Sequence, residues 1–207
     1  LKWAIRKKFQ LKKFKIGHAG TLDPLATGLL IICTGKFTKR IYELQGLAKD
    51  YTGTITLGAT TPSFDLETEK NETFAIDHIT EQLIRETTSN FIGDIEQIPP
   101  VFSALKKDGK RLYEYAREGK EVEIKKRLVT ISEFDIININ LPEIEFRVVC
   151  SKGTYIRSLA HDFGKALQSG GHLSALRRTK IGDFNVNKAQ DPIVFGEMML
   201  GNGNNSH

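Results

Sequence analysis

Strict alternation of apolar and polar residues predicts β-strands in several parts of the chain. In Tyr51–Leu57 the threonines occupy every second position, which is typical of a strand with one solvent-facing side. Strands are also predicted over residues 128–141, 143–150 and 172–181. Within the third of these four segments, apolar residues share one side: Ile144, Phe146, Val148 and Cys150. The short apolar run Leu29–Cys33 predicts a buried strand.

Apolar residues spaced three and four positions apart predict helices. The clearest stripe follows Thr154, which we expect to cap the helix, and consists of Ile156, Leu159, Ala160, Phe163 and Leu167. Helices are also predicted over residues 1–9 and 37–44, and a third stripe runs through Ile79, Leu83, Thr87 and Phe91. Because strands outnumber helices and do not alternate regularly with them, we expect an α+β fold with a mixed, largely antiparallel central sheet flanked by helices.

Composition narrows the class of protein. The 207 residues are 40% hydrophobic and 27% charged, which excludes a disordered or collagen-like chain, and the length fits one domain or one domain with a substantial insertion. The longest apolar run is too short to cross a bilayer. Cys33 and Cys150 lie far apart and form no disulfide framework, so we expect a reducing, cytoplasmic location. The chain starts at Leu1 without an apolar signal core, from which we expect an amino-terminal truncation and no export signal.

The net charge of +5 is unevenly distributed. Residues 1–20 carry seven cations and no acid, and residues 101–127 carry nine cations and five acids. Residues 21–100 are acidic by contrast, with six cations and twelve acids. Two basic segments on such a body favour a polyanionic partner, because clustered cations release counterions from phosphates. Charge alone equally allows a solvated helix face and a charged loop.

Several common site motifs are excluded. Thr34-Gly35-Lys36 fails as a phosphate-binding loop, since Leu30 and Phe37 stand where glycine and a hydroxyl residue are required. The histidines lack metal-binding spacing and clustered acids, so we expect no metal site. The chain also lacks a Gly-x-Ser-x-Gly elbow and a dinucleotide-binding fingerprint.

The loop from Gly17 to Gly28 is the strongest candidate site. Asp23 precedes Pro24, which pushes the aspartate backbone toward an extended conformation. With Gly20 nearby, a carboxylate is presented on a special loop and not on a solvated helix. Spacing alone favours an ordinary Asp-Pro turn.

A wider set of motifs gives this loop its context. Residues 15–30 read KIGHAGTLDPLATGLL and resemble the signature loop of the TruB family of pseudouridine synthases. The resemblance continues, in the family's order and spacing, through residues 49–51, 93–100, 103–106, 109–119, 150–157 and 176–179. Within this family, the sequence resembles the bacterial stand-alone type, which modifies position 55 in the T-loop of tRNA. The guide-RNA-dependent relatives are less similar around the Asp loop.

The resemblance implies a pseudouridine synthase fold with Asp23 as the nucleophile. Arg157 is the expected partner of Asp23, because a guanidinium forms a paired fork with a carboxylate. Attack on C6 of the base, attack on C1′ of the ribose, and initial action as a base all stay open for Asp23. The family needs no cofactor and no metal, and we expect none here.

Other residues match the family's pocket. Of Tyr51 and Tyr155, one would stack on the uracil and the other would reach C5 as a general base or orient the ring. Leu176 matches an apolar pocket wall, and His18 could fill the gap left by a flipped base. From the residues alone, Tyr51 and Leu176 are equally core residues and His18 is a loop histidine.

The second basic segment, residues 101–127, resembles the family's insertion that grips the T-loop. Its candidate phosphate contacts are Lys106, Lys107, Lys110 and Arg111. We expect residues 1–190 to form one catalytic domain that includes this insertion, with its amino-terminal strand missing. Residues 191–207 are expected to be a tail that frays after Gly201 and forms no separate domain.

We therefore expect a cytoplasmic, monomeric enzyme that binds the T-stem-loop of tRNA without guide RNA or membrane. Three alternatives stay open. A tRNA-binding or RNA-folding module would keep the basic segments without needing Asp23. A pseudouridine synthase with an rRNA target would keep Asp23 and change the insertion. A basic scaffold domain would leave the ordered motifs unexplained.

Overall fold

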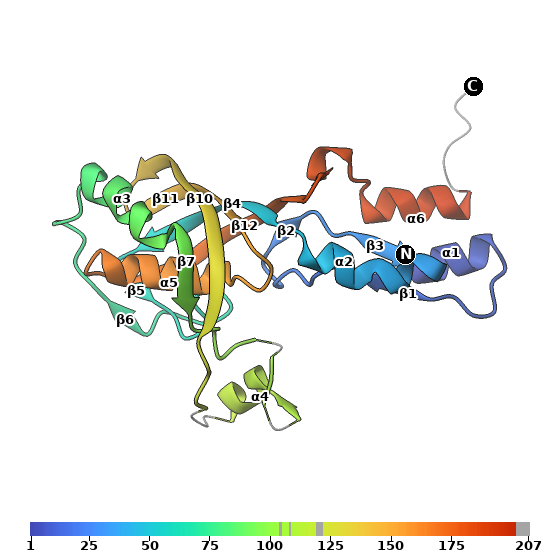
Figure 1. Ribbon diagram of the computed structural model, residues 1–207, viewed down its shortest axis with the longest axis horizontal. Coiled ribbons are helices and arrows are strands. Elements are labelled where there is room, and N and C mark those ends of the chain that lie inside the picture. Colours follow the sequence, from blue (N-terminus) through green and yellow to red (C-terminus); the bar gives the residue numbers. More distant parts are fainter. Residues whose placement is uncertain (104, 108, 119–121, 202–207) are drawn as a thin grey trace.

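The computed structural model describes residues 1–103, 105–107, 109–118 and 122–201 (Figure 1). Its body is a mixed, largely antiparallel sheet that has seven strands within these ranges and runs β13–β12–β4–β11–β10–β7, with β2 parallel to β12. The strands are β2 (Thr27–Gly28), β4 (Lys49–Leu57), β7 (Gly93–Gln97), β10 (Arg127–Asn140), β11 (Glu143–Cys150), β12 (Gly171–Ile181) and β13 (Phe184–Asn185). The expected α+β class and the strands predicted over 51–57, 128–141, 143–150 and 172–181 are confirmed.

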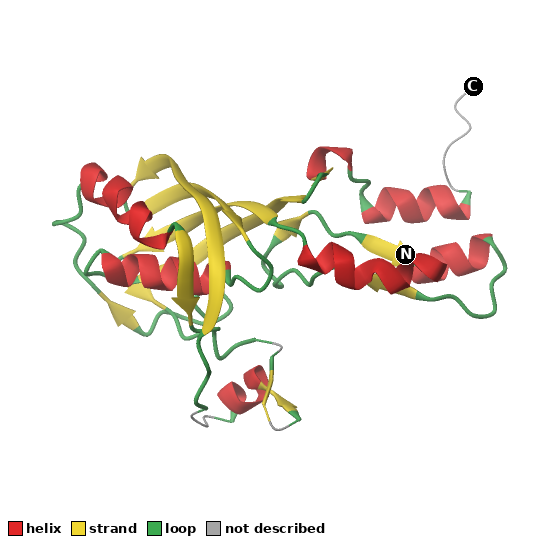
Figure 2. Ribbon diagram, viewed as in Figure 1, coloured by secondary structure: helices red, strands yellow, loops and turns green. Residues whose placement is uncertain are grey.

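One face of this sheet is covered by α5 (Ile156–Ala166), and α3 (Glu81–Thr87) with its 3₁₀ continuation η2 (Thr88–Phe91) packs near β10 (Figure 2). The core between them is aromatic and aliphatic. Phe134 lies edge-to-face with Phe146 and Phe163, at centroid distances of 5.9 and 5.3 Å. The predicted face of β11 is fully buried, as period-two alternation requires. A short hairpin, β5 (Ala59–Thr60) with β6 (Glu72–Thr73), lies at the end of β4.

A second group of elements lies at the right of Figure 1, where the first and last helices pack side by side. These elements, which we call the terminal lobe, are α1 (Lys2–Lys8), β1 (Ile16–His18), β3 (Ile32–Thr34), η1 (Gly35–Arg40), α2 (Ile41–Gly46) and α6 (Pro192–Leu200). Helix α6 packs on α1 and follows the short η3 (Val186–Lys188). The Asp191 carboxylate caps it by accepting from the N–H groups of Ile193 and Val194. Most of the segment 191–207, expected to be a tail, therefore forms a packed helix, and residues 202–207 lie outside the described residues.

The basic segment between β7 and β10 stands away from the sheet (Figure 1). It contains the hairpin β8 (Lys106–Lys107) and β9 (Lys110–Arg111), followed by α4 (Leu112–Arg117). Leu112 is buried, and its N–H donates to the Leu105 carbonyl at 2.7 Å. The insertion therefore has its own small hairpin-and-helix structure.

Three local predictions are wrong. The strand predicted over Leu29–Cys33 begins only at Ile32. The Leu29 N–H instead donates to a carbonyl of β12, and the Leu29 side chain is buried. Leu83 is exposed and its neighbour Ile84 is fully buried in its place, whereas Ile79 and Thr87 of the predicted stripe are buried as expected. Thr154 does not cap α5, since its hydroxyl donates to the Ser151 carbonyl.

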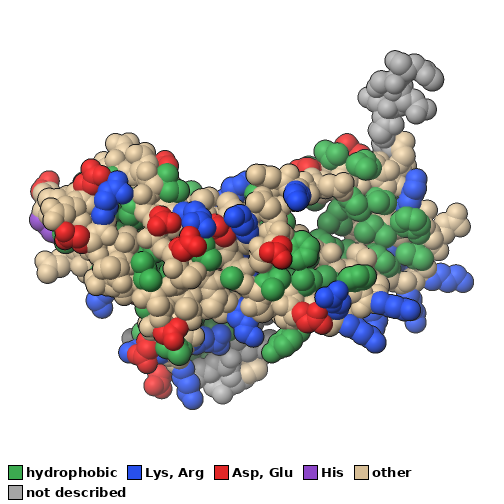
Figure 3. Space-filling model, turned by 45° about the horizontal axis from the view of Figure 1, so that its top comes forward, with side chains coloured by type: hydrophobic (Ala, Val, Ile, Leu, Met, Phe, Trp, Pro, Cys, Tyr) green, Lys and Arg blue, Asp and Glu red, His purple; other side chains and the backbone are tan. Residues whose placement is uncertain are grey.

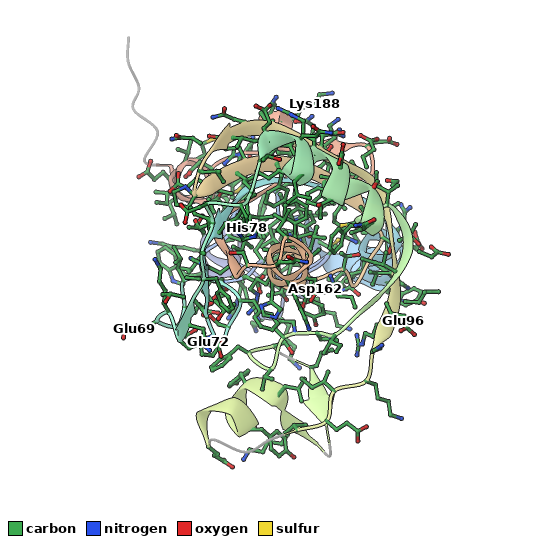
Figure 4. The ribbon with its side chains drawn as sticks, turned by 90° about the vertical axis from the view of Figure 1, so that its left-hand side faces the viewer. Glu69, Glu72, His78, Glu96, Asp162 and Lys188 are labelled. Carbon is green, nitrogen blue, oxygen red and sulfur yellow. The ribbon has the colours of Figure 1, made fainter. Side chains whose placement is uncertain are left out.

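An acid on α5 has an unusual environment. Figure 4, which views α5 nearly end-on, shows Asp162 below the sheet. Burial raises the pKa of the Asp162 carboxyl to about 6, partly offset by Lys165. The folded pKa lies above the unfolded value, so the native state holds the proton more tightly and stability falls as pH rises from about 4 to about 6. Above about pH 6 the Asp162 carboxyl is ionised in the folded protein, and the full cost of burying its charge lowers the stability.

Asp162→Asn is therefore expected to raise the free energy of unfolding at pH 7.5 by about 1–2 kcal/mol, with a smaller gain as the pH approaches 4. Urea unfolding at several pH values measures this directly. Asp183→Asn, at an exposed position after β12, is the control and should change little at any pH. An equal gain for Asp162→Asn at pH 4 and pH 7.5 would rule out ionisation as the cause.

Candidate active site

Asp23 lies on a tight turn between β1 and β2. The Ala26 N–H donates to the Asp23 carbonyl at 2.9 Å, which closes the turn over Pro24. Gly20 and Gly28 flank it with φ angles of +101° and +103°, a region that favours glycine. The chain therefore leaves β1, turns at the aspartate and joins the main sheet at β2.

Arg178 of β12 holds this loop in place through hydrogen bonds. Its guanidinium is buried and donates to the carbonyls of Leu29 at 2.8 Å, Gly20 at 3.0 Å and Thr21 at 3.4 Å. A Cβ at Gly28 would lie 2.3 Å from the Arg178 carbonyl oxygen, so this close approach requires glycine. Both ends of the Asp23 loop are thus tied to one residue of the sheet.

Arg157, in the first turn of α5, holds the Asp23 carboxylate. Its Nη2 lies 2.9 Å from Oδ1 and its Nε lies 3.2 Å from Oδ2, a two-pronged contact. The arginine side chain is only 3% exposed, whereas the aspartate side chain is 36% exposed. A buried, always charged donor thus fixes a carboxylate that stays open to the solvent side.

Arg157 has further partners in the polar segment between β5 and β6 and at Phe102, in the segment after β7. Its Nη1 donates to the carbonyls of Ser63 at 3.3 Å and Phe102 at 2.9 Å. Its Nε lies 3.6 Å from the buried Asp65 carboxylate. These contacts fix the plane of the guanidinium and balance its charge. Asp65 was missed from the sequence because polar residues in a turn-rich stretch look like exposed loop residues.

Asp23 lines a cleft of about 610 Å³ at the junction of the sheet, α5 and the terminal lobe. Three further residues expected in the pocket also line it, namely Tyr51, Tyr155 and Leu176. Cationic residues are frequent in the described lining, which includes Lys49, Arg127, Lys152, Arg157 and Arg178. The cleft therefore combines a fixed carboxylate, two aromatic rings and excess positive charge.

Tyr155 is positioned through its backbone by Gln97. The Gln97 side chain accepts from the Tyr155 N–H at 2.7 Å and donates to the Tyr155 carbonyl at 3.0 Å. Gln97 is itself buried at the end of β7. Burial raises the pKa of the Tyr155 and Tyr51 phenols, and nearby Arg178 partly opposes the rise at Tyr51. Both phenols are therefore protonated hydrogen-bond donors at neutral pH.

Lys49 closes one wall of the cleft. Its ammonium donates to the carbonyls of Gln45 and Leu47 at 2.5 and 2.6 Å, and so ties the end of α2 to β4. Burial lowers the pKa of Lys49, and the neighbouring Arg178 lowers it further. Lys49 thus links the terminal lobe to the strand that carries Tyr51.

The remaining sequence-predicted residues lie elsewhere. His18 is exposed on β1, opposite Ile32 and outside the described lining of the cleft. Lys106 and Lys107 pair with Arg111 and Lys110 in the β8–β9 hairpin. The Lys110 ammonium is paired with Glu118, and it lies 5.0 Å from the Tyr115 ring centroid. The side chains of Lys106, Lys107 and Arg111 lie outside the described part of the structure.

The surface shows where charge gathers outside the cleft. In Figure 3, Lys and Arg side chains gather along one edge of the terminal lobe, and hydrophobic side chains gather around α6. The segment that starts this lobe supplies seven cations. Among the described residues, no group of His, Cys, Asp and Glu side chains is arranged to hold a metal ion. Within the same residues, every helix is too short or too polar to span a membrane.

Comparisons with known proteins cover almost the whole described chain. A family model described as the N-terminal domain of TruB family pseudouridylate synthases matches residues 6–156. A model of the tRNA pseudouridylate synthase B C-terminal domain matches residues 157–192. The described residues that line the cleft all lie inside these two matches.

Full-length relatives and a solved structure agree with these matches. Proteins named tRNA pseudouridine synthase B share 66% identity over 200 residues in Flavobacterium johnsoniae (96% of this chain, 87% of the relative) and 56% over 191 residues in Bacteroides fragilis (92% and 82%). A chain in a Cbf5-Nop10-Gar1 complex aligns with a TM-score of 0.64 and 30% identity over 89% of this chain. This chain spans 44% of that longer one.

Proposed function

The chain belongs to the TruB family of pseudouridylate synthases, and on that premise we propose that it isomerises uridine 55 in the T-loop of tRNA, with Asp23 as the nucleophile. It is thus an isomerase that acts on RNA, in the manner of its relatives named tRNA pseudouridine synthase B. The observation that carries the proposal is the fork between buried Arg157 and the Asp23 carboxylate inside a basic cleft.

The reaction sets definite requirements. The bond between N1 of uracil and C1′ of ribose breaks, the base turns, and a bond forms between C5 and C1′. The C5 proton leaves and N1 gains a proton, so the atoms balance without a redox agent. A carboxylate must therefore meet the base or sugar, and the detached base must be retained. Asp23 supplies the carboxylate, and its partial exposure leaves it able to reach the substrate.

Arg157 acts on the reaction through Asp23. A guanidinium fork stabilises the ionised carboxylate and fixes the direction of both oxygens. Because Arg157 is held in turn by Asp65 and by backbone carbonyls, the fork cannot rotate freely. The nucleophile is thus preorganised before the RNA binds.

Tyr51, Tyr155 and Leu176 would enclose the uracil. One ring stacks on the base and the other orients it, while Leu176 forms the apolar wall. Burial keeps both phenols protonated at neutral pH. A tyrosine that accepts the C5 proton would therefore have to lose its own proton first, so orientation is the role that the phenols fill most readily.

We assign substrate binding to the basic insertion and the remaining roles to one catalytic unit. Residues 101–127 grip the T-loop through Lys106, Lys107, Lys110 and Arg111, and residues 1–190 form the catalytic domain, followed by the segment 191–207. His18 would fill the space left by the flipped uridine. The enzyme would act as a cytoplasmic monomer, without guide RNA, cofactor or metal.

Tritium release from uridine labelled at C5 tests the proposed function. Unmodified tRNA transcript is expected to release tritium with the protein alone, in buffer containing a metal chelator. A T-arm stem-loop should release it as well, and an rRNA transcript should not. Tight tRNA binding without release would instead favour the RNA-folding module. Release from rRNA in preference to tRNA would overturn the assigned substrate.

A further inference from the structure

A solvent-exposed tyrosine contacts a lysine that lines the cleft. Tyr42 lies on α2 and is 74% exposed, which is unusual for so large an apolar ring. The Lys152 ammonium lies 5.2 Å from the centroid of this ring, close enough for a cation–π contact. Lys152 comes from the turn between β11 and α5, where Gly153 has a φ angle of +86°. The pair therefore bridges the terminal lobe and the sheet body.

The position of the pair relative to Asp23 follows from the helix. Gln45, three residues after Tyr42, lines the cleft, and residues three apart share a helix face. Lys152 lines the same cleft directly. Tyr42 thus lies on the side of α2 that faces the cleft mouth, and Lys152 holds one side of its ring while most of the ring stays open.

We propose that Tyr42 and Lys152 form a nucleotide subsite for the RNA residue next to the target uridine. The Tyr42 ring stacks on the base of that neighbour, and the Lys152 ammonium binds its phosphate. This inference rests on the proposed function, because it requires an RNA strand whose uridine occupies the cleft. It adds two binding residues outside the pocket that encloses the uracil.

The chemistry of the cleft mouth favours a nucleotide over other occupants. A uridine that leaves its stack exposes a face of the adjacent base, and an aromatic side chain can restore the lost stacking. An RNA strand whose uridine enters the cleft would carry its phosphates past the cleft-lining cations Lys152 and Arg127. An aromatic face beside an ammonium matches one base and one phosphate, the repeating unit of a single strand.

Steady-state tritium release with three RNAs tests the stacking contact. The RNAs are the intact T-arm and two versions that lack the base immediately 5′ or 3′ of the target uridine. Tyr42→Ala is expected to raise KM about five- to tenfold on intact RNA, with kcat within about twofold. On the RNA that lacks the stacked base, the same variant should leave KM unchanged. Tyr42→Trp keeps an aromatic ring for stacking and should have the wild-type KM on intact RNA.

A matched control separates stacking from general surface effects. Phe37 on η1 is 61% exposed and lies 5.8 Å from Arg40, but Arg40 lies outside the described lining of the cleft, whereas the Lys152 beside Tyr42 belongs to it. Phe37→Ala should leave KM unchanged on all three RNAs. An equal rise in KM for Tyr42→Ala on all three RNAs, or an unchanged KM on intact RNA, would overturn the stacking role. Inactivity of the wild type would instead refute the proposed function.

Salt dependence tests the phosphate contact. Lys152→Gln should lower the slope of log affinity against log salt by about 0.7, the value of one phosphate contact on a single strand. Lys165→Gln, at an exposed position near the end of α5, is the control and should keep the wild-type slope. A wild-type slope in Lys152→Gln would overturn the role given to Lys152.

Discussion

Asp23→Asn is expected to lower the rate of tritium release by at least about a thousandfold, with RNA affinity within about threefold of the wild type. Asparagine has nearly the same shape and can still accept one hydrogen bond from Arg157. Asparagine, however, carries no negative charge and cannot act as the nucleophile. Losing one negative charge in a basic cleft should, if anything, strengthen the binding of phosphates. Single-turnover tritium release and a binding titration on the same tRNA separate the two effects.

Two companion variants sharpen this result. Asp23→Glu keeps the charge but extends the side chain by one methylene, so it cannot keep both oxygens on the guanidinium, and the rate should fall at least a hundredfold. Asp183→Asn, at an exposed site after β12, should leave the rate unchanged. If Asp23→Asn retained more than a tenth of the wild-type rate, the nucleophile would have to be another group.

Arg157→Met is expected to destabilise the fold by about 3–5 kcal/mol and to abolish activity, because it leaves the buried Asp65 carboxylate without its charged partner. Arg157→Lys keeps a cation without the fork and should lower the rate about a hundredfold with a smaller loss of stability. Urea unfolding and single-turnover tritium release measure the two quantities independently.

The double variant Arg157→Met with Asp65→Asn distinguishes the two functions of Arg157. Removing the buried carboxylate should restore most of the lost stability, since the remaining Asp23 carboxylate is partly exposed and solvated. Activity should stay absent, because Asp23 still has no fork. Recovery of activity together with stability would show that Arg157 serves the fold alone.

Local patterning predicted most of the sheet and its main helix. The alternation in β4 and β11 and the stripe of α5 each describe one buried face, and burial of that face is what the core requires. Prediction failed where tertiary contacts override the local pattern. Leu29 belongs to an apolar run, but its N–H and its carbonyl both form hydrogen bonds with Arg178, and the strand does not begin there.

The candidate site was predicted only in part. Asp23 and Arg157 follow from their motifs, and the structure places them in contact. The supporting roles of three further residues were not predicted: Gln97 and Arg178 stand within matched motifs and Asp65 in a turn, but nothing in the local sequence marks them as buried partners. Their burial follows from the partners they meet across the fold, and one sequence contains no local sign of such partners. Helix α6 was missed because nothing before Asp191 indicates that α1 will cover it.

The hydrogen bonds between Arg178 and the Asp23 loop also determine at what stage of its synthesis the enzyme becomes active. Its hydrogen bonds to Leu29 and Gly20 join residues 149 and 158 positions apart, and the Arg157 fork spans 134. A nascent chain on the ribosome therefore carries its aspartate long before it carries anything to orient it. Modification activity should emerge abruptly, with the synthesis of β12, and a growing chain should leave every RNA that it meets untouched until then.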